Sequence, residues 1–289
     1  MPLKASEFIL NEDGSIYHLN LRPEHLADTI ITVGDPDRVA KVTEHFDDIE
    51  FSIKKREFHT QTGSYRGKRI SVISTGIGTD NIDIVFNELD ALVNIDFEKK
   101  EVKKQLKSLD IIRIGTTGSI QAEIPIDTFL LSEKAIGFDG LLHFYQSEEI
   151  IDNHFSEAFI KHMDWFPKKA HPYVVDNSKK LQKLLDAEDI FKGITATNIG
   201  FYGPQGRSLR LGLQDDQMKA KMATFNYHDQ KITNLEMETS GIYGMSKLLG
   251  HNAVSMNVIL ANRATGEFST TPQKTMEKLI GYCLDKLTS

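Results

Sequence analysis

The sequence contains a single cysteine, Cys283, among its 289 residues. One thiol forms no disulfide within the chain, and without a cysteine cluster nothing indicates a zinc site. No stretch approaches the roughly 18 consecutive apolar residues of a membrane-spanning helix, and the N-terminal segment lacks the apolar core of a signal peptide. We therefore expect a soluble, cytoplasmic protein with no disulfide, no metal site and no contact with membranes.

An excess of positive charge is also missing, since the net charge is −7 and the pI is about 5.8. This balance argues against a nucleic-acid-binding protein, which would need a basic face. It does not exclude a small anionic ligand, because a few arginines at one place matter more than the total charge. Repeats, low-complexity tracts and linkers are absent as well, so we expect one domain over residues 1–289.

Hydrophobic patterns predict strands that alternate with helices along the whole chain. This alternation is typical of a three-layer α/β/α fold around a central mixed β-sheet. Residues 49–74 predict successive antiparallel strands, and a helix is expected from about residue 79 to residue 93. The charged stretch 97–108 predicts an exposed helical insertion or a hairpin, and residues 166–175 predict a connector. Further helices are expected near 153–164, 177–187, 239–249 and 272–287.

The stretch from residue 109 to residue 119 (LDIIRIGTTGS) is the centre of this pattern. Its apolar first half predicts a buried strand, and its glycine-rich second half, with Gly115 and Gly118, predicts a tight turn. Arg113 lies within the apolar run, where a guanidinium is costly unless an anion or a carboxylate meets it. One interpretation is an anion pocket, with Thr116 adding a hydroxyl at the carboxyl end of the strand. The alternative is an ordinary turn with Arg113 paired to a structural carboxylate.

A second anion signal follows the predicted strand 27–33. Gly34 precedes Asp35, which can cap a helix, and Pro36, which fits the first helical turn. Such a helix start presents free backbone N–H groups to an anion, and Arg38 would reach the same place. The alternative is a plain turn with a solvated Arg38.

Residues 200–207 (GFYGPQGR) predict a receptor for a planar polar ring. Phe201 can stack on such a ring, the Gln205 amide offers one acceptor and one donor, and Arg207 offers several donors. Uracil presents an acceptor, a donor and an acceptor along one edge, which matches this set. The alternative is a surface loop with a structural aromatic side chain.

Three further positions stand out, with alternatives left open. Glu236 and Glu238 flank Met237 between a short strand and a helix, where carboxylates can accept hydrogen bonds from ribose hydroxyls or, alternatively, can cap the helix. By pattern alone, His18 favours a structural or exposed histidine, and Arg56, which follows two lysines, favours a solvated edge.

Several of these motifs together resemble those of the uridine phosphorylases, within the nucleoside phosphorylase family. The resemblance spans residues 15 to 272 and keeps the motifs in the same order. Purine-specific bacterial relatives carry a Ser-Asp pair where this chain has Asn262 and Arg263, which favours a pyrimidine base. The matching segments are 33–38 (VGDPDR), 56–58 (REF), 74–78 (STGIG), 113–118 (RIGTTG), 201–207 (FYGPQGR), 236–238 (EME) and 262–263 (NR).

The resemblance implies reversible phosphorolysis of uridine to uracil and ribose 1-phosphate. Phosphate is then a co-substrate, and no cofactor is expected. The alternatives are a phosphorylase for deoxyuridine, thymidine or a purine nucleoside, or a nucleoside hydrolase. By this resemblance, phosphate would be bound by Gly34, Arg38, Arg113 and Thr116, with Arg56 from a neighbouring subunit. Ribose would be bound by Glu236, Met237 and Glu238, with a neighbour's His18 at the 5′-hydroxyl. The base would be bound by Phe201, Gln205 and Arg207, with Arg263 beside it.

Shared sites of this kind imply a homodimer, often assembled into a hexamer. The chain departs from the family at residues 79–81 (TDN), where a Gly-Pro-Ser run is usual. The serine of that run helps bind a monovalent cation in some bacterial members, with the glutamate that matches Glu57. Asn81 could replace the serine, but the departure weighs against that cation here. Residues 97–108 and parts of 145–190 resemble insertions, which could alter the oligomer.

Overall fold

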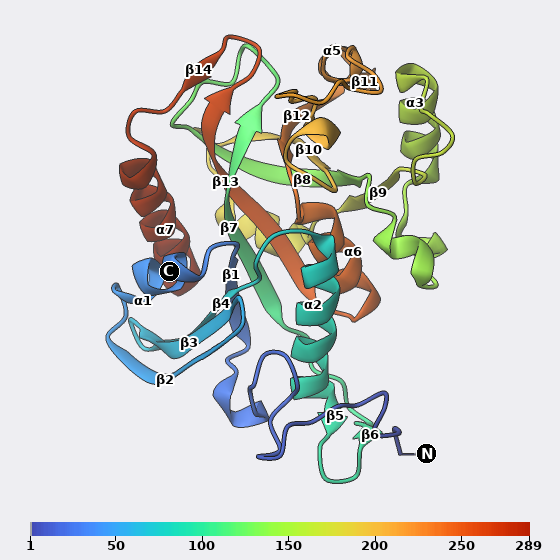
Figure 1. The fold of residues 1–289 in the computed structure, drawn as a ribbon. Coiled ribbons are helices and arrows are strands. Elements are labelled where there is room, and N and C mark those ends of the chain that lie inside the picture. Colours follow the sequence, from blue (N-terminus) through green and yellow to red (C-terminus); the bar gives the residue numbers. More distant parts are fainter. Residues whose placement is uncertain (1) are drawn as a thin grey trace.

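The computed structural model describes residues 2–289, and a mixed β-sheet runs through it (Figure 1). The strand order along the sheet is β11-β12-β10-β8-β13-β7-β1-β4-β3-β2, with β14 paired to β13 and β9 paired to β8. The expected α/β fold with a central mixed sheet is confirmed. The strands are β1 (Thr29–Val33), β2 (Asp48–Lys55), β3 (Phe58–Tyr65), β4 (Lys68–Ser74), β7 (Asp110–Ser119), β8 (Phe129–Gly137), β9 (Tyr173–Asp176), β10 (Phe191–Thr197), β11 (Asn226–Tyr227), β12 (Gln230–Glu236), β13 (Asn252–Asn262) and β14 (Glu267–Phe268).

Helices cover both faces of this sheet. Those expected from the sequence form close to their expected ranges, whereas the short helix Met218–Thr224 was not predicted. Short 3₁₀ turns lie at Pro23–His25, Leu141–Phe144, Glu148–Ile150 and Gly203–Gln205. No helix within residues 2–289 is long and apolar enough to cross a bilayer. The α-helices are α1 (Pro36–Thr43), α2 (Thr79–Asn94), α3 (Asn153–Met163), α4 (Lys179–Leu185), α5 (Met218–Thr224), α6 (Thr239–Leu248) and α7 (Pro272–Thr288).

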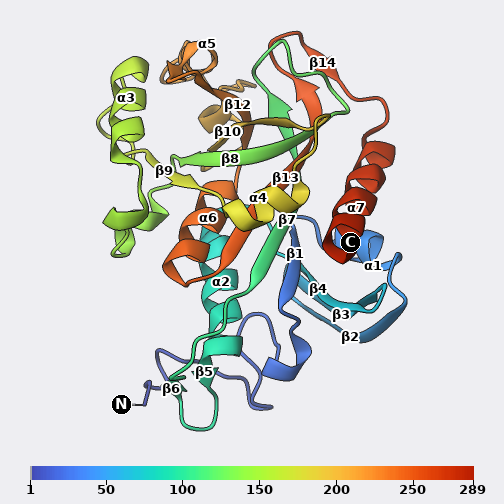
Figure 2. The same cartoon turned by 180° about the vertical axis from the view of Figure 1, so that it is seen from behind.

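The alternation of side chains along the central strands builds the two outer layers. Ile30 on β1 lies opposite Ile111 on β7, and both pack in the core formed with α2 and α6. The next residues on each strand point to the other face, where they pack against α1, α4 and α7. Figure 1 shows α2 and α6 on one side of the sheet, and Figure 2 shows α4 and α7 on the other.

Three expectations about local structure are corrected by the fold. The turn expected at Gly115 to Gly118 is wrong, because β7 continues through both glycines to Ser119. Residues 97–108 lie at a small hairpin of β5 (Ile95–Asp96) and β6 (Glu101–Val102), so the helical alternative is wrong and the hairpin is confirmed. The connector 166–175 contains most of β9, which joins the edge of β8.

The long β7 brings distant segments together at its carboxyl end. It pairs in parallel with β13 along its whole length and in antiparallel with β12 at Gly118 and Ser119. The sheet therefore closes on itself through β12, and the end of β12 at Glu236 lies near the middle of β7. This closure places the glutamate motif and Arg113 on a common site.

Candidate active site

A cleft of about 810 Å³ opens at the carboxyl ends of β1, β4 and β12. It gathers most of the segments that the sequence singles out, from positions more than 200 residues apart in the chain. The predicted residues that line it are Gly34, Arg38, Arg113, Thr116, Phe201, Gln205, Arg207, Glu236, Met237 and Glu238.

Arg113 is buried at the floor of this cleft and is held on two sides. Its Nη2 donates to Glu238 Oε2 at 2.6 Å and lies 3.2 Å from Glu236 Oε2, while its Nη1 donates to Asn257 Oδ1 at 2.7 Å. Burial acts to lower the pKa of the guanidinium, but the two carboxylates outweigh it and raise that pKa. The structure therefore confirms the pairing of Arg113 with carboxylates, and the anion pocket stays a prediction for an arginine that also lines the cleft.

Gly115 explains why a glycine follows Arg113 within a continuous strand. A Cβ atom at this position would lie 1.9 Å from Arg113 Nη1 and 2.8 Å from Asn257 Oδ1. The arginine side chain folds back over the strand into the space that a larger residue would fill. The glycine therefore serves the orientation of Arg113, not a turn.

Arg38 faces the same cleft from the first turn of α1. The Asp35 side chain accepts a hydrogen bond from the Asp37 N–H at 2.9 Å, so this helix start is capped as expected. Within residues 2–289, no hydrogen bond or ion pair holds the Arg38 side chain. Burial lowers the pKa of Arg38, and the positive charge of Arg113 lowers it further. Two guanidinium groups thus face one space, which is the electrostatic setting of an anion site.

The two glutamates have different surroundings. Glu236 Oε2 accepts from the backbone N–H groups of Glu238 and Thr239 at 2.9 Å each, and Glu236 Oε1 accepts from Thr197 Oγ1 at 2.7 Å. It therefore caps α6, as one of the open alternatives stated. Glu238 Oε1 accepts from the Gly78 N–H at 2.9 Å, and burial raises the pKa of this carboxyl although Arg113 opposes the shift.

The loop after β10 forms the other wall. Arg207 lies over the ring of Phe201, with its guanidinium carbon 3.9 Å from the ring centroid, and donates to Gln205 Oε1. Arg263 donates from behind the loop to the Gln205 carbonyl at 2.6 Å and is not itself a lining residue. Burial, with Arg207 nearby, lowers the pKa of Arg263 to about 10. The loop is therefore braced by two arginines around a buried Gln205.

Comparison with known proteins agrees with this arrangement. A family model described as the phosphorylase superfamily matches residues 28–284. The chain belongs to the phosphorylase superfamily. Its members act on nucleosides and phosphate, and the chain is accordingly an enzyme of the pentosyltransferase type.

Individual relatives in the superfamily differ in the base that they take. The chain is 30% identical over 275 residues to a uridine phosphorylase of Thermococcus kodakarensis, covering 91% of this chain and 83% of that one. It is 28% identical over 271 residues to a DeoD-type purine nucleoside phosphorylase of Clostridium novyi, covering 93% and 97%. A solved Trypanosoma brucei nucleoside phosphorylase with uridine phosphorylase activity superimposes with a TM-score of 0.82 at 29% identity, covering 97% and 99%.

Besides Arg263, two predicted residues lie outside the chain's own cleft. His18 is held by Glu88, with Nδ1 and Oε1 2.7 Å apart, and Arg56 is an exposed residue in the turn between β2 and β3. Glu57, beside Arg56, does line the cleft, as does Asn81, and the side chains of both lie against Gly76. Within residues 2–289, no group of three or more histidine, cysteine, aspartate or glutamate residues is placed to hold a metal ion.

Sequence reasoning missed two participants. Asn257 holds Arg113 from β13, and its presence as a polar residue inside the apolar run 254–261 was a usable signal. Phe268 on β14 lines the cleft although 65% of it is exposed. It lies in the stretch 265–272, which the sequence predicts as a mobile loop without marking Phe268 itself.

Proposed function

We propose that the chain catalyses reversible phosphorolysis of uridine to uracil and ribose 1-phosphate, in pyrimidine salvage. One observation carries the proposal: Arg38 and Arg113 face the same cleft as Gln205 and Arg207 of the loop after β10. The arginine pair suits a phosphate, and the loop suits a planar base with hydrogen-bonding edges.

The mechanism follows from the charges that develop as the glycosidic bond breaks. Positive charge grows on the sugar, and phosphate held by Arg38 and Arg113 attacks C1′ and stabilises that charge. Negative charge grows on the departing uracil, and Arg207 with the Gln205 amide disperses it. Glu238 would accept from a ribose hydroxyl. Orientation and preorganised charge supply the catalysis, so no side-chain nucleophile and no cofactor are needed.

The choice of a pyrimidine rests on Gln205 and Arg207. A purine presents a different edge and would leave donors of Arg207 poorly matched, and unpaired polar groups in such a site cost about 1–3 kcal/mol each. Hydrolysis is the second candidate, but water needs no pair of arginines. Deoxyuridine and thymidine share the same base edge and belong to the same proposal.

Product analysis tests this function directly. Purified enzyme incubated with uridine is expected to release uracil and ribose 1-phosphate only when phosphate is present, as followed by chromatography. Inosine and adenosine serve as the matched purine substrates. Release of free ribose without phosphate would indicate a hydrolase, and equal turnover of inosine would leave only the broader phosphorylase assignment.

The active site is also proposed to be shared between subunits. His18 and Arg56 lie outside the chain's own cleft, and the resemblance assigns them to a neighbour's ribose and phosphate. A homodimer with two shared sites, which could assemble further into a hexamer, would bring them into place.

A further inference from the structure

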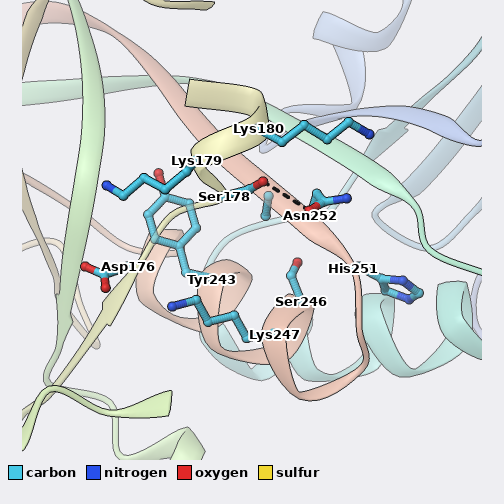
Figure 3. A pocket seen from close by; sticks show the side chains of 10 residues that line it. Asp176, Ser178, Lys179, Lys180, Tyr243, Ser246, Lys247, His251 and Asn252 are labelled. Carbon is cyan, nitrogen blue, oxygen red and sulfur yellow. Dashed lines mark hydrogen bonds between the residues drawn. The ribbon is translucent and has the colours of Figure 1, made fainter. Parts of the chain in front are cut away.

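A second cavity, of about 280 Å³, lies at the other end of β13 from the cleft (Figure 3). The cavity touches β13 at Asn252 and Ala253, whereas the cleft touches it at Leu260 and Ala261, roughly 26 Å further along an extended strand. The two sites therefore share no residue. The lining residues are Asp176, Ser178, Lys179, Lys180, Tyr243, Ser246, Lys247, His251, Asn252 and Ala253.

The lining carries more positive than negative charge. Lys180 is paired with Asp110 at 2.7 Å, and Asp176 is already paired with Lys134 at 2.9 Å. In the described part of the chain, Lys179 donates only to the neutral amide of Gln182, at 3.0 Å. The pairs formed with Asp110 and Asp176 thus leave Lys179 without a carboxylate of its own.

Lys247 is the second lysine without such a partner. Within residues 2–289, no hydrogen bond or ion pair holds its ammonium group, although it is half-buried. Burial lowers its pKa, Asp176 opposes that shift, and Lys134 and Lys179 add to it. The ammonium groups of Lys134, Lys179 and Lys247 lie near two carboxylates, those of Asp152 and Asp176. This group of side chains therefore has one positive charge in excess.

A buried hydroxyl without a partner points into the same space. Ser246, on α6, is 1% exposed, and its Oγ has no hydrogen-bond partner among residues 2–289. Figure 3 shows this oxygen directed into the cavity, between Lys247 on one side and the bonded pair of Ser178 and Asn252 on the other. Buried polar groups are generally paired, so an unpaired hydroxyl at a cavity wall is free to donate to a ligand in the cavity.

We propose that this cavity binds a small oxyanion of the phosphate class, separate from the phosphate of the active site. A tetrahedral oxyanion offers several acceptor oxygens and carries the negative charge that lysine side chains attract. It would accept from the Ser246 hydroxyl and neutralise the excess charge of Lys179 and Lys247. Its contacts fall on the last turns of α6, the helix whose first turn follows Glu238.

Equilibrium dialysis of the full-length protein with radiolabelled inorganic phosphate tests the proposal. The wild-type chain is expected to bind two phosphates. Ser246→Ala and Lys247→Gln should each weaken binding of the phosphate in the cavity at least tenfold and leave binding of the other phosphate unchanged. Arg38→Ala should weaken the other phosphate and keep the one in the cavity, which separates this site from the function proposed for the cleft.

Two further variants make the result decisive. Lys183→Gln, at an exposed lysine of α4 outside the cavity, should bind as the wild type does, and Lys247→Arg should retain the second site because it keeps the charge. Ser246→Ala removes a single unpartnered oxygen, so it serves as the test even if Lys247→Gln fails to fold. The proposal is overturned if the wild-type chain binds one phosphate and Arg38→Ala abolishes that binding. It is also overturned if the wild-type chain binds two phosphates and Ser246→Ala weakens neither of them.

Discussion

Arg38 and Arg113 face one cleft, but the chain holds them differently. Arg113 is fixed by Glu236, Glu238 and Asn257, so its removal would leave buried carboxylates without their cation. Breaking a buried pair in this way costs about 3–5 kcal/mol, which would mix a folding defect with any loss of phosphate binding. Arg38 has no such partners within residues 2–289, and it is therefore the cleaner probe of the anion site.

Arg38→Ala is expected to raise the KM for phosphate and lower kcat/KM at least tenfold, about 1.4 kcal/mol of transition-state stabilisation. The melting temperature should change little, because no hydrogen bond or ion pair within residues 2–289 depends on this side chain. Steady-state kinetics with varied phosphate measure the effect. Lys41→Ala, at an exposed lysine of the same helix, is the control and should be unchanged. An unaltered phosphate KM in Arg38→Ala would remove the arginine pair from the mechanism.

The base preference depends on Gln205, which is 2% exposed although it lines the cleft. We expect the native enzyme to prefer uridine to inosine by at least about 100-fold in kcat/KM, as sites built from hydrogen-bonding groups can achieve. Gln205→Ala should remove most of that preference and leave the phosphate KM in place. Gln217→Ala, at an exposed position outside the cleft, is the matched control. A preference that survives in Gln205→Ala would assign recognition of the base to other groups.

At the scale of the elements, the sequence predicts the strands and helices well where apolar periodicity is clear. The capped start of α1, the helix α2 and the apolar run that begins β7 all follow from local pattern. The continuation of β7 through Gly115 and Gly118 does not, because it depends on pairing with β12 and β13, which are distant in sequence. Gly115 makes room for Arg113 and for Asn257, which lies 142 residues further along the chain. The strand β9 was missed for a similar reason, since its pairing with β8 alone defines it.

Gly115→Ala tests this account of β7. The added methyl group would lie 1.9 Å from Arg113 Nη1, so the arginine must leave its bonds to Asn257 and Glu238. We expect a loss of at least tenfold in kcat/KM together with a lower melting temperature. In Gly118→Ala the nearest atom to the new methyl group would be Arg263 Cδ at 3.5 Å, an ordinary contact, so the melting temperature should stay near that of the wild type. Equal melting temperatures for the two variants would contradict the role given to Gly115.

At the scale of the whole molecule, the cleft of one chain lacks two of the groups that the resemblance assigns to the site. His18 is bound to Glu88, close to the α2 face, and Arg56 extends from an exposed turn with a positive φ of 55°. Residue patterns alone favour a structural or exposed His18 and a solvated Arg56, since nothing local marks a side chain that acts in another subunit. Only the order of motifs along the chain suggested such a role.

Mixing two defective chains tests whether the sites are shared. One chain carries His18→Ala and Arg56→Ala, and the other carries Arg38→Ala and Gln205→Ala, so each homodimer lacks native groups in both sites. In a mixed dimer, the site built on the first chain receives native His18 and Arg56 from the second and is complete. Random exchange makes half of the dimers mixed, each with one native site of two, so about a quarter of the wild-type activity should return. Subunit exchange confirmed by native mass spectrometry, without any recovery of activity, would show that each site is complete within a single chain.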